Sequence, residues 1–217
     1  MNTLKNYSTL ISNLPVLEQC FITKRESWKK AENKFPWFKI LNDELFKDLD
    51  TLQISRKDIF NTKDSIKNKI ILAIFWGYPR GMRGNHFIEI LFNMEKLEKL
   101  IFSLQNLEFA NDSDFSKIIN EFANIPGLGI STYSKLLYFF KISFNNNPCV
   151  ILDQRLIDVF QKSEFVEFES LKNIKRYNCE SKYLNYLKLM SSTSIKLNTR
   201  CENLEQFLFI FGNNLKV

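Results

Sequence analysis

The feature that most constrains the fold is a proline–glycine turn, IPGLG at residues 125–129, between two segments with apolar residues at helical spacing. Gly127 and Gly129 permit positive φ angles and leave bare backbone at the turn. Leu128, between them, is expected to point inward and hold the two helices together. Free N–H groups followed at once by a helix N-terminus make an anion site. Residues 114–140 therefore predict a helical hairpin that binds a phosphate. An ordinary helical hairpin with a glycine turn is also compatible with this sequence.

Helical spacing of apolar residues dominates the rest of the chain. We expect one long helical face over 4–31, and helices over 37–49, 62–76, 85–106 (one or two), 113–125, 154–163 and 203–211. Ser113 is a predicted helix cap, and Gly212 is expected to close the last helix. A brief alternation over 164–174 fits a short strand or an irregular loop.

No internal repeat and no Gly/Ser linker divides the 217 residues, so the sequence predicts a single unit with an all-α fold. We expect two helical lobes with an interlobe cleft. One lobe would hold residues 62–160, including the hairpin. The other would hold residues 1–61 plus 161–217.

A second unusual stretch is VILDQRL, residues 150–156, where one acid, Asp153, interrupts an apolar run and precedes a helical segment. An aspartate at this place caps the helix, and the helix N-terminus would keep it ionised. A structural cap and a functional carboxylate are both compatible with this pattern. Arg155, two residues on, would orient the aspartate, touch a phosphate or lie on the surface.

A third unusual stretch is FWGYPRGMRGN, residues 75–85, which crowds glycines, a proline, two arginines and aromatics at a helix end. Such a loop suits close approach to a nucleic-acid backbone, with Arg80 and Arg83 as its cations. Tyr78 or Arg80 would fill the gap left by a flipped base. Trp76 would stack on that base, or it would be a core tryptophan that ends a buried helix.

The hairpin followed by CVILDQRL resembles the helix-hairpin-helix (HhH-GPD) superfamily of DNA glycosylases. The resemblance is most specific over residues 114–160 and extends loosely to residues 70–85 and to LEQFLFIFG. It implies that Asp153 is the catalytic aspartate, and that Gly127, Leu128, Gly129 and Ser131 bind DNA. In bifunctional members a lysine stands two residues after the second hairpin glycine, where this chain has Ser131.

Lys135 stands one helical turn beyond Ser131, about 6 Å along the axis, a displacement that a lysine stem can cover. Its offset resembles a bacterial branch described as 8-oxoguanine-glycosylase-like. The resemblance implies an enzyme that flips a modified base out of double-stranded DNA, with 8-oxoguanine favoured. Lys135 would attack C1′ and form a Schiff base, giving lyase activity, while Asp153 stabilises the charge on the sugar. Alternatively, Lys135 neutralises a phosphate and the enzyme uses water.

The net charge of +6 permits a polyanionic partner, although the high lysine content is also typical of an AT-rich genome. One histidine and four scattered cysteines do not predict a zinc site, and they suit a reducing compartment. No signal-peptide pattern and no membrane-spanning run is visible, so we expect a cytoplasmic monomer. We expect no cofactor, although the resemblance implies a monovalent cation at the hairpin carbonyls.

Three other functions fit parts of the sequence. A glycosylase could act in defence by removing a modified base from phage DNA, since base choice depends on pocket shape rather than on fold. A non-catalytic helix-hairpin-helix protein could bind DNA, but it would not need Lys135 together with an acid in an apolar run. An all-α scaffold that binds protein is disfavoured by the basic charge and the glycine hairpin.

Overall fold

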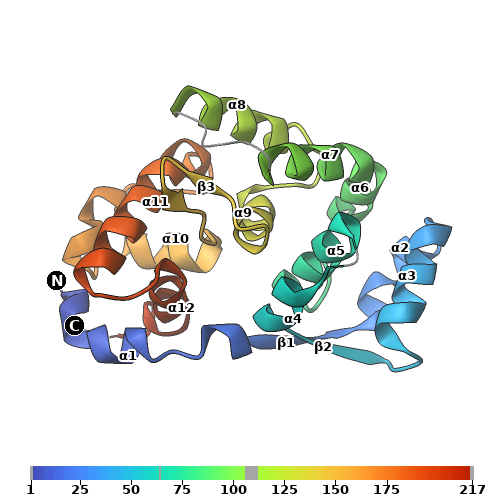
Figure 1. Cartoon of the computed structure of the whole chain (residues 1–217), viewed down its shortest axis with the longest axis horizontal. Helices are drawn as coiled ribbons and strands as arrows, with labels where there is room; N and C mark the ends of the chain where they lie inside the picture. Colours follow the sequence, from blue (N-terminus) through green and yellow to red (C-terminus); the bar gives the residue numbers. More distant parts are fainter. Residues whose placement is uncertain (1, 64, 106–111, 216–217) are drawn as a thin grey trace.

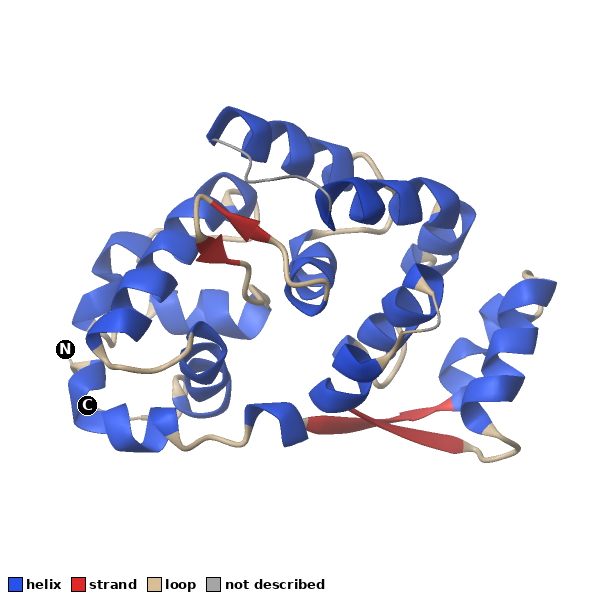
Figure 2. Ribbon diagram, viewed as in Figure 1, coloured by secondary structure: helices blue, strands red, loops and turns tan. Residues whose placement is uncertain are grey.

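The computed structural model describes residues 2–63, 65–105 and 112–215. As predicted, they form an all-α fold, with two small antiparallel sheets (Figures 1 and 2). The α-helices are α1 (Ser8–Ser12), α2 (Lys29–Glu32), α3 (Pro36–Phe46), α4 (Arg56–Asn61), α5 (Ile66–Gly77), α6 (His86–Phe92), α7 (Met94–Gln105), α8 (Asp112–Ala123), α9 (Ile130–Phe139), α10 (Gln154–Gln161), α11 (Cys179–Lys196) and α12 (Cys201–Phe211). Short 3-10 helices lie at η1 (Leu4–Tyr7), η2 (Val16–Glu18), η3 (Arg25–Trp28) and η4 (Val166–Leu171). The strands are β1 (Cys20–Lys24), β2 (Thr51–Ser55), β3 (Ser143–Phe144) and β4 (Asn147–Pro148).

The centre of the molecule is α9, the second helix of the hairpin (Figure 1). It packs along α5 on one side, and α10 and α12 lie on the other. Every side chain of α9 except that of Ser131 is buried. A helix that is buried on all sides carries apolar residues on every face. Its polar members Thr132, Ser134 and Lys135 therefore mark positions where a specific partner is needed.

The long helix expected over residues 4–31 is wrong. Pro15 cannot continue the short α1, and β1 pairs instead with β2, with Phe21 opposite Ile54. Both strands are rich in β-branched and aromatic residues, which favour a pleated surface. Each strand buries one of them, Thr23 in β1 and Ile54 in β2. The helical spacing of the apolar residues was coincidental here, because they belong to separate turns and a strand.

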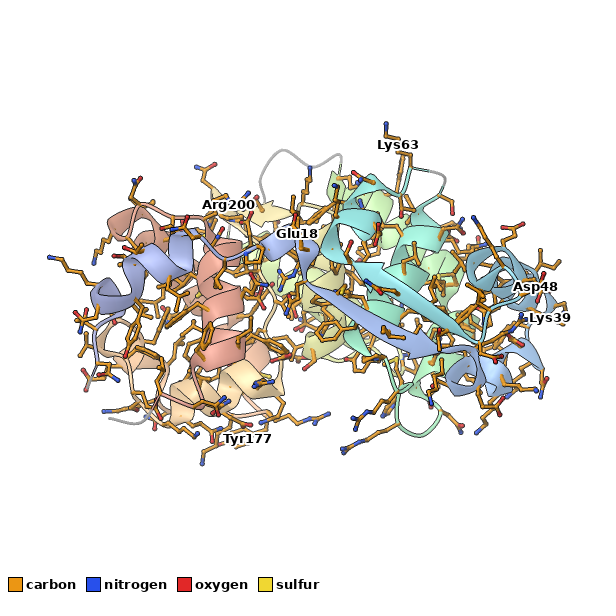
Figure 3. All side chains as sticks on the ribbon, turned by 90° about the horizontal axis from the view of Figure 1, so that it is seen from below. Glu18, Lys39, Asp48, Lys63, Tyr177 and Arg200 are labelled. Atoms are coloured by element: carbon orange, nitrogen blue, oxygen red, sulfur yellow. The ribbon has the colours of Figure 1, made fainter. Side chains whose placement is uncertain are left out.

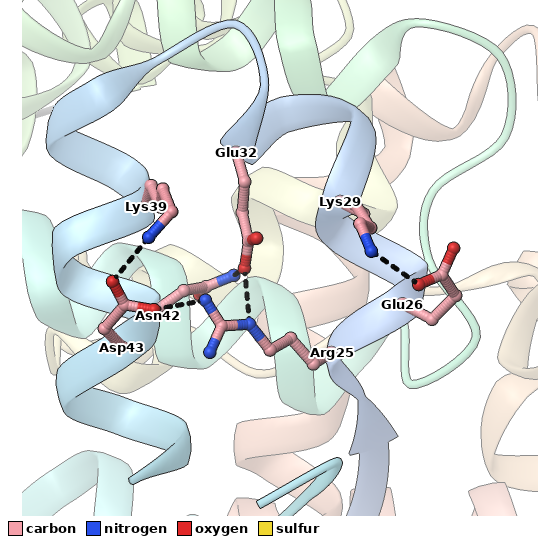
Figure 4. Close-up of polar contacts among 7 residues, drawn as sticks. All are labelled: Arg25, Glu26, Lys29, Glu32, Lys39, Asn42 and Asp43. Atoms are coloured by element: carbon pink, nitrogen blue, oxygen red, sulfur yellow. Dashed lines mark hydrogen bonds and ion pairs between the residues drawn. The ribbon is translucent and has the colours of Figure 1, made fainter. Parts of the chain in front are cut away.

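A polar network fastens the end of β1 to α2 and α3 (Figure 4). Arg25 donates to Glu32 at 2.9 Å and also to Asp43. Asn42 donates to Glu32 at 2.8 Å, and Lys39 donates to Asp43 at 2.9 Å. The Arg25 guanidinium, together with Lys39, lowers the pKa of Asp43. Because one arginine fork holds two carboxylates, the α2–α3 pair is fixed relative to the strands.

Several element boundaries differ from those expected. Ser65 caps α5, which begins at Ile66 rather than near Thr62, and Asp64 lies outside the described residues. The stretch with brief alternation forms η4 rather than a strand. The two helices allowed for residues 85–106 are α6 and α7, which meet at Asn93.

The ends of α8 and α12 also differ in detail. Because α8 begins at Asp112, Ser113 lies inside the helix rather than before it. Gly212 closes α12 as expected, but its φ of −54° is right-handed. A Cβ at Gly212 would lie 2.8 Å from Cγ2 of Val159. Close packing of α12 against α10, not a left-handed turn, is therefore the reason for this glycine.

Seen from below, the β1–β2 ribbon runs toward the end of the molecule marked by Lys39 and Asp48 (Figure 3). Tyr177 and Arg200 mark the opposite part, beside the C-terminal helices (Figure 3). Within the described ranges, no helix combines the length and the apolar character that crossing a membrane requires.

Candidate active site

The predicted hairpin consists of α8, a turn at residues 124–129, and α9. Gly127 has a φ of +80°, and a Cβ on it would lie 2.9 Å from the Cα of His86. Glycine is required here both by the backbone conformation and by the close approach of α6. Leu128 is buried in the core, as expected of the residue that holds the two helices together.

Gly129, the second glycine of the turn, plays a different role from Gly127. Its φ of −82° is one that any residue adopts, so the expected positive φ applies to Gly127 alone. No atom of the part of the chain that the structure describes lies within 4 Å of the position that a Cβ on Gly129 would take. Gly129 is itself the N-cap residue of α9 and offers the helix no side-chain cap. The hairpin therefore presents open backbone and an uncapped helix N-terminus, the features that bind an anion.

Lys135 lies on α9 with only 5% of its surface exposed. Its Nζ donates to the carbonyl oxygen of Ser131 at 2.5 Å, one helical turn back toward the hairpin. The ammonium also lies 5.2 Å from the centre of the Tyr78 ring. The lysine side chain therefore spans the one helical turn between residues 135 and 131, because its amine contacts the backbone of Ser131.

Asp153 precedes α10 and caps it, accepting a hydrogen bond from the backbone N–H of Leu156 at 3.1 Å. This bond confirms the structural interpretation of Asp153. The cap does not exclude a second role, because a carboxylate has further lone pairs to offer.

Three buried side chains hold the segment that leads into Asp153, residues 150–152. The bonds run from Tyr183 to the oxygen of Val150 (2.9 Å), from Tyr186 to the oxygen of Ile151 (2.6 Å), and between Ser134 Oγ and the N–H and oxygen of Leu152 (3.1 and 3.4 Å). Burial raises the pKa of both tyrosines well above the ordinary value, so each remains a hydrogen-bond donor. The carboxylate is therefore placed by a rigid segment rather than by a free loop.

Lys135 and Asp153 line the same pocket, which has a volume of about 170 Å³. This is small beside the roughly 300–1,000 Å³ of pockets for drug-sized ligands, and it suits a single ring system. The lining residues are Gln19, Phe21, Arg56, Trp76, Gly77, Pro79, Lys135, Ile151, Asp153, Glu205 and Phe209. The pocket joins aromatic walls to an amine and carboxylates.

A buried ion pair in this pocket was missed at the level of sequence. Arg56 Nη2 donates to Glu205 Oε2 at 2.7 Å, and their side chains are 0% and 2% exposed. The guanidinium also lies 5.0 Å from the ring centres of Trp76 and Tyr138. Burial raises the pKa of Glu205, with Asp153 adding to the effect, while Arg56 and Lys135 oppose it. The available signal was Glu205 itself, an acid next to apolar residues of the last helix, but its partner is 149 positions away.

The aromatic residues expected to meet a base lie close to the pocket. Trp76 is only 4% exposed and donates from Nε1 to the oxygen of Gln19 at 3.1 Å, so it is a core residue that also forms a pocket wall. Tyr78 is half-buried, and its hydroxyl lies 2.7 Å from Oγ1 of Thr132 on α9. The ring of Tyr78 is therefore tied to the hairpin helix.

The predicted DNA-binding arginines lie outside the pocket. Arg80 and Arg83 are exposed on the loop after α5. Arg155 is exposed on α10, with its guanidinium 4.8 Å from the ring centre of Phe209. Arg155 therefore makes a stacking contact at the pocket edge, not a described bond to Asp153.

A family model described as "Putative 8-oxoguanine DNA glycosylase OGG-like protein" matches residues 14–209. The match spans the hairpin, Lys135, Asp153 and both members of the Arg56–Glu205 pair. No curated protein and no solved structure matches the chain significantly.

Proposed function

The chain belongs to this family of OGG-like proteins, and we propose that it is a DNA glycosylase that excises an oxidised base, with 8-oxoguanine as the favoured substrate. The observation that carries the proposal is that Lys135 and Asp153 line one small pocket with aromatic walls. We further assign the hairpin and the aspartate after it to the helix-hairpin-helix superfamily, in its bacterial 8-oxoguanine-glycosylase-like branch.

In the proposed reaction the hairpin holds a DNA phosphate and the target base enters the pocket. Gly127, Gly129 and Ser131 bring the uncapped start of α9 to the phosphate, and Leu128 anchors the turn in the core. Arg80, Arg83 and Arg155 add salt-dependent affinity for the backbone. The small pocket volume supports a base without a large added group, and so favours an oxidised base over a bulky modified base of phage DNA.

The chemistry would take place at C1′ of the flipped nucleotide. Lys135 Nζ gives up one proton and attacks C1′, while the bond from C1′ to the base breaks. The departing base takes the electron pair of that bond and picks up a proton. Asp153 stabilises the positive charge on the sugar while the bond breaks. Opening of the sugar ring then gives a Schiff base on Lys135, which makes strand cleavage by elimination available.

The burial of Lys135 supports the role of nucleophile over that of phosphate contact. A lysine that meets a phosphate extends into solvent, whereas this one is 5% exposed and lies in the pocket. A DNA-binding protein without catalysis would need neither this buried amine nor an aspartate in the same pocket. The carbonyl oxygen of Gly129 already accepts two backbone N–H groups, so a monovalent cation at the hairpin would be held by other carbonyls. No step of the proposed reaction involves that ion.

Base release from a duplex with one 8-oxoguanine tests the proposal. We expect the wild-type protein to leave an abasic or cleaved site, and Asp153→Asn to lower the rate by a factor of about 100 or more. The matched control is Asp158→Asn on the same helix, whose carboxylate is paired with Gln154. Intact DNA with 8-oxoguanine and with other oxidised bases would reject the glycosylase function.

A further inference from the structure

Glu205 is a buried carboxylate in the pocket wall to which the proposed reaction gives no task. Its Oε2 accepts from Arg56 at 2.7 Å. Its other oxygen, Oε1, accepts no hydrogen bond from any described residue. Burying a carboxylate is costly unless its oxygens are bonded. A buried carboxylate with one unpaired oxygen, in a pocket wall, is therefore arranged for a ligand that donates an N–H.

The guanidinium of Arg56 holds two pocket groups at once. Besides Glu205, it donates from Nε to Oε1 of Gln19 at 2.8 Å. An arginine has only donors to offer, so the amide oxygen of Gln19 must face it. The same cation opposes the rise in the pKa of Glu205 that burial causes, and its hydrogen bond fixes the direction of the carboxylate. The rings of Trp76 and Tyr138, whose centres each lie 5.0 Å from the guanidinium, help to hold it in place.

We propose that Glu205 reads the edge of the flipped base, accepting hydrogen bonds from N1–H and the amino group of a guanine-type base through Oε1. Arg56 is the positioning residue for this carboxylate. The inference rests on the proposed function, because it places the base in the pocket of Lys135 and Asp153. It adds to that function the residue that selects a guanine-type base.

The selection follows from the hydrogen atoms that each base carries. Guanine and 8-oxoguanine present N–H groups at N1 and N2, and both point toward an acceptor on that edge. Adenine and 8-oxoadenine present a lone pair at N1, which a carboxylate repels. A site built to accept N–H bonds rejects an analogue that lacks them, because the buried acceptor is left unpaired.

A purely structural role would join α4 to α12 through the ion pair and would need nothing more. It accounts for the bond from Arg56 to Oε2, but it gives no reason for the free Oε1 in the pocket. The two roles also differ in what they change. A structural pair affects stability and all substrates equally, whereas a reading residue changes the preference between two bases.

The experiment compares binding of duplexes that carry 8-oxoguanine or 8-oxoadenine as 2′-fluoroarabino nucleotides. The fluorine opposes positive charge at C1′, so the duplex is bound but not cut. Each base stands opposite an abasic-site analogue, so that base pairing does not differ between the two. These two bases share the oxidised five-membered ring and differ at N1 and its neighbours. Excision of the ordinary 8-oxoguanine duplex is measured in parallel.

We expect the wild-type protein to bind the 8-oxoguanine duplex at least about tenfold more tightly. In Glu205→Gln the ratio should fall toward one, because an amide can donate as well as accept. The matched control Glu202→Gln changes a glutamate on the same helix that pairs with Arg200 outside the pocket, and should keep the ratio. Thermal unfolding establishes that each variant is folded. The ratio of the two affinities measured with the wild type tests the inference even if a variant fails to fold.

The outcomes separate this inference from the proposed function. Equal binding of the two duplexes by the wild type, or a ratio unchanged in Glu205→Gln, would overturn the role of Glu205 even if excision is robust. A clear preference that Glu205→Gln abolishes, without any excision, would support Glu205 as the reading residue and reject the glycosylase reaction. Preference and excision together support both.

Discussion

The side chain of Lys135 lies directly against Gly77, at the end of α5. A Cβ on Gly77 would be 2.6 Å from Cδ and 2.7 Å from Cε of the lysine. The two residues are far apart in the sequence, yet the lysine side chain can enter the pocket only because Gly77 has no side chain. The glycine at the end of α5 thus leaves room for the side chain of the proposed nucleophile.

Gly77→Ala should therefore displace the amine while sparing the fold. The backbone of Gly77 is helical and accepts alanine, which favours a helix by up to about 1 kcal/mol. The clash falls on a flexible stem, which moves away. Since a displacement of about 1 Å can cost a factor of about 100 in rate, single-turnover excision should slow by that order. The double variant Gly77→Ala/Lys135→Ala should be no slower than Lys135→Ala, and independent effects of the two changes would contradict this account.

The two hairpin glycines should separate stability from DNA binding. Gly127→Ala places a side chain at φ +80° and against His86, so we expect a loss of at least about 1–2 kcal/mol in the free energy of unfolding. Gly129→Ala meets no atom of the described residues and should leave that free energy almost unchanged. It should nevertheless weaken duplex binding, because the phosphate would approach this open backbone. Urea unfolding and a binding titration distinguish them, and wild-type duplex affinity in Gly129→Ala would remove the hairpin from the interface.

Moving the lysine one turn back should restore part of the activity. Because Nζ of Lys135 already reaches the carbonyl oxygen of Ser131, a lysine at position 131 would start close to that place. We expect Ser131→Lys/Lys135→Ala to recover adduct formation that Lys135→Ala loses. The double variant Ser131→Met/Lys135→Ala carries a stem without an amine and should recover none. If neither double variant formed an adduct, the amine would be needed at a position that a lysine at residue 131 does not reach.

Glu205 should make stability depend on pH. Burial raises its pKa in the folded protein above the value near 4.3 of an unfolded chain, so the folded state keeps the proton to higher pH. The contribution of Glu205 to the free energy of unfolding is then greatest below about pH 4.3, and it declines as the pH rises through the pKa of the folded state. The free energy of unfolding of the wild type relative to Glu205→Gln should fall over that window. The charged groups that act on Glu205 are Arg56, Lys135 and Asp153, and all three remain in the variant. A difference that is constant or rises with pH would contradict the assignment.

Sequence reasoning was most successful where local chemistry decides the structure. The turn around Gly127 was predictable because a left-handed residue between two apolar-periodic segments needs glycine. Asp153 was predictable as a cap because an aspartate before a helix meets free N–H groups. Both features depend on neighbours in the chain.

The structural features that could not be predicted from the sequence depend on contacts between segments that are distant in the chain. The pairing of β1 with β2 was missed because apolar spacing alone fits a helix, and the strand partner lies about thirty residues away. The partnership of Arg56 with Glu205 joins α4 to α12, and no local pattern announces it. Close packing explains Gly77 and Gly212, which the sequence presented only as helix ends.

The most direct test of the central claim is trapping of the protein on DNA with borohydride. The reductant fixes a Schiff base as a stable covalent bond, which a denaturing gel detects with a labelled 8-oxoguanine duplex. We predict an adduct with the wild type and with Lys117→Ala, a change at a lysine whose side chain is 75% exposed on α8, and none with Lys135→Ala. An adduct that persists in folded Lys135→Ala would show that another amine is the nucleophile and would contradict the account.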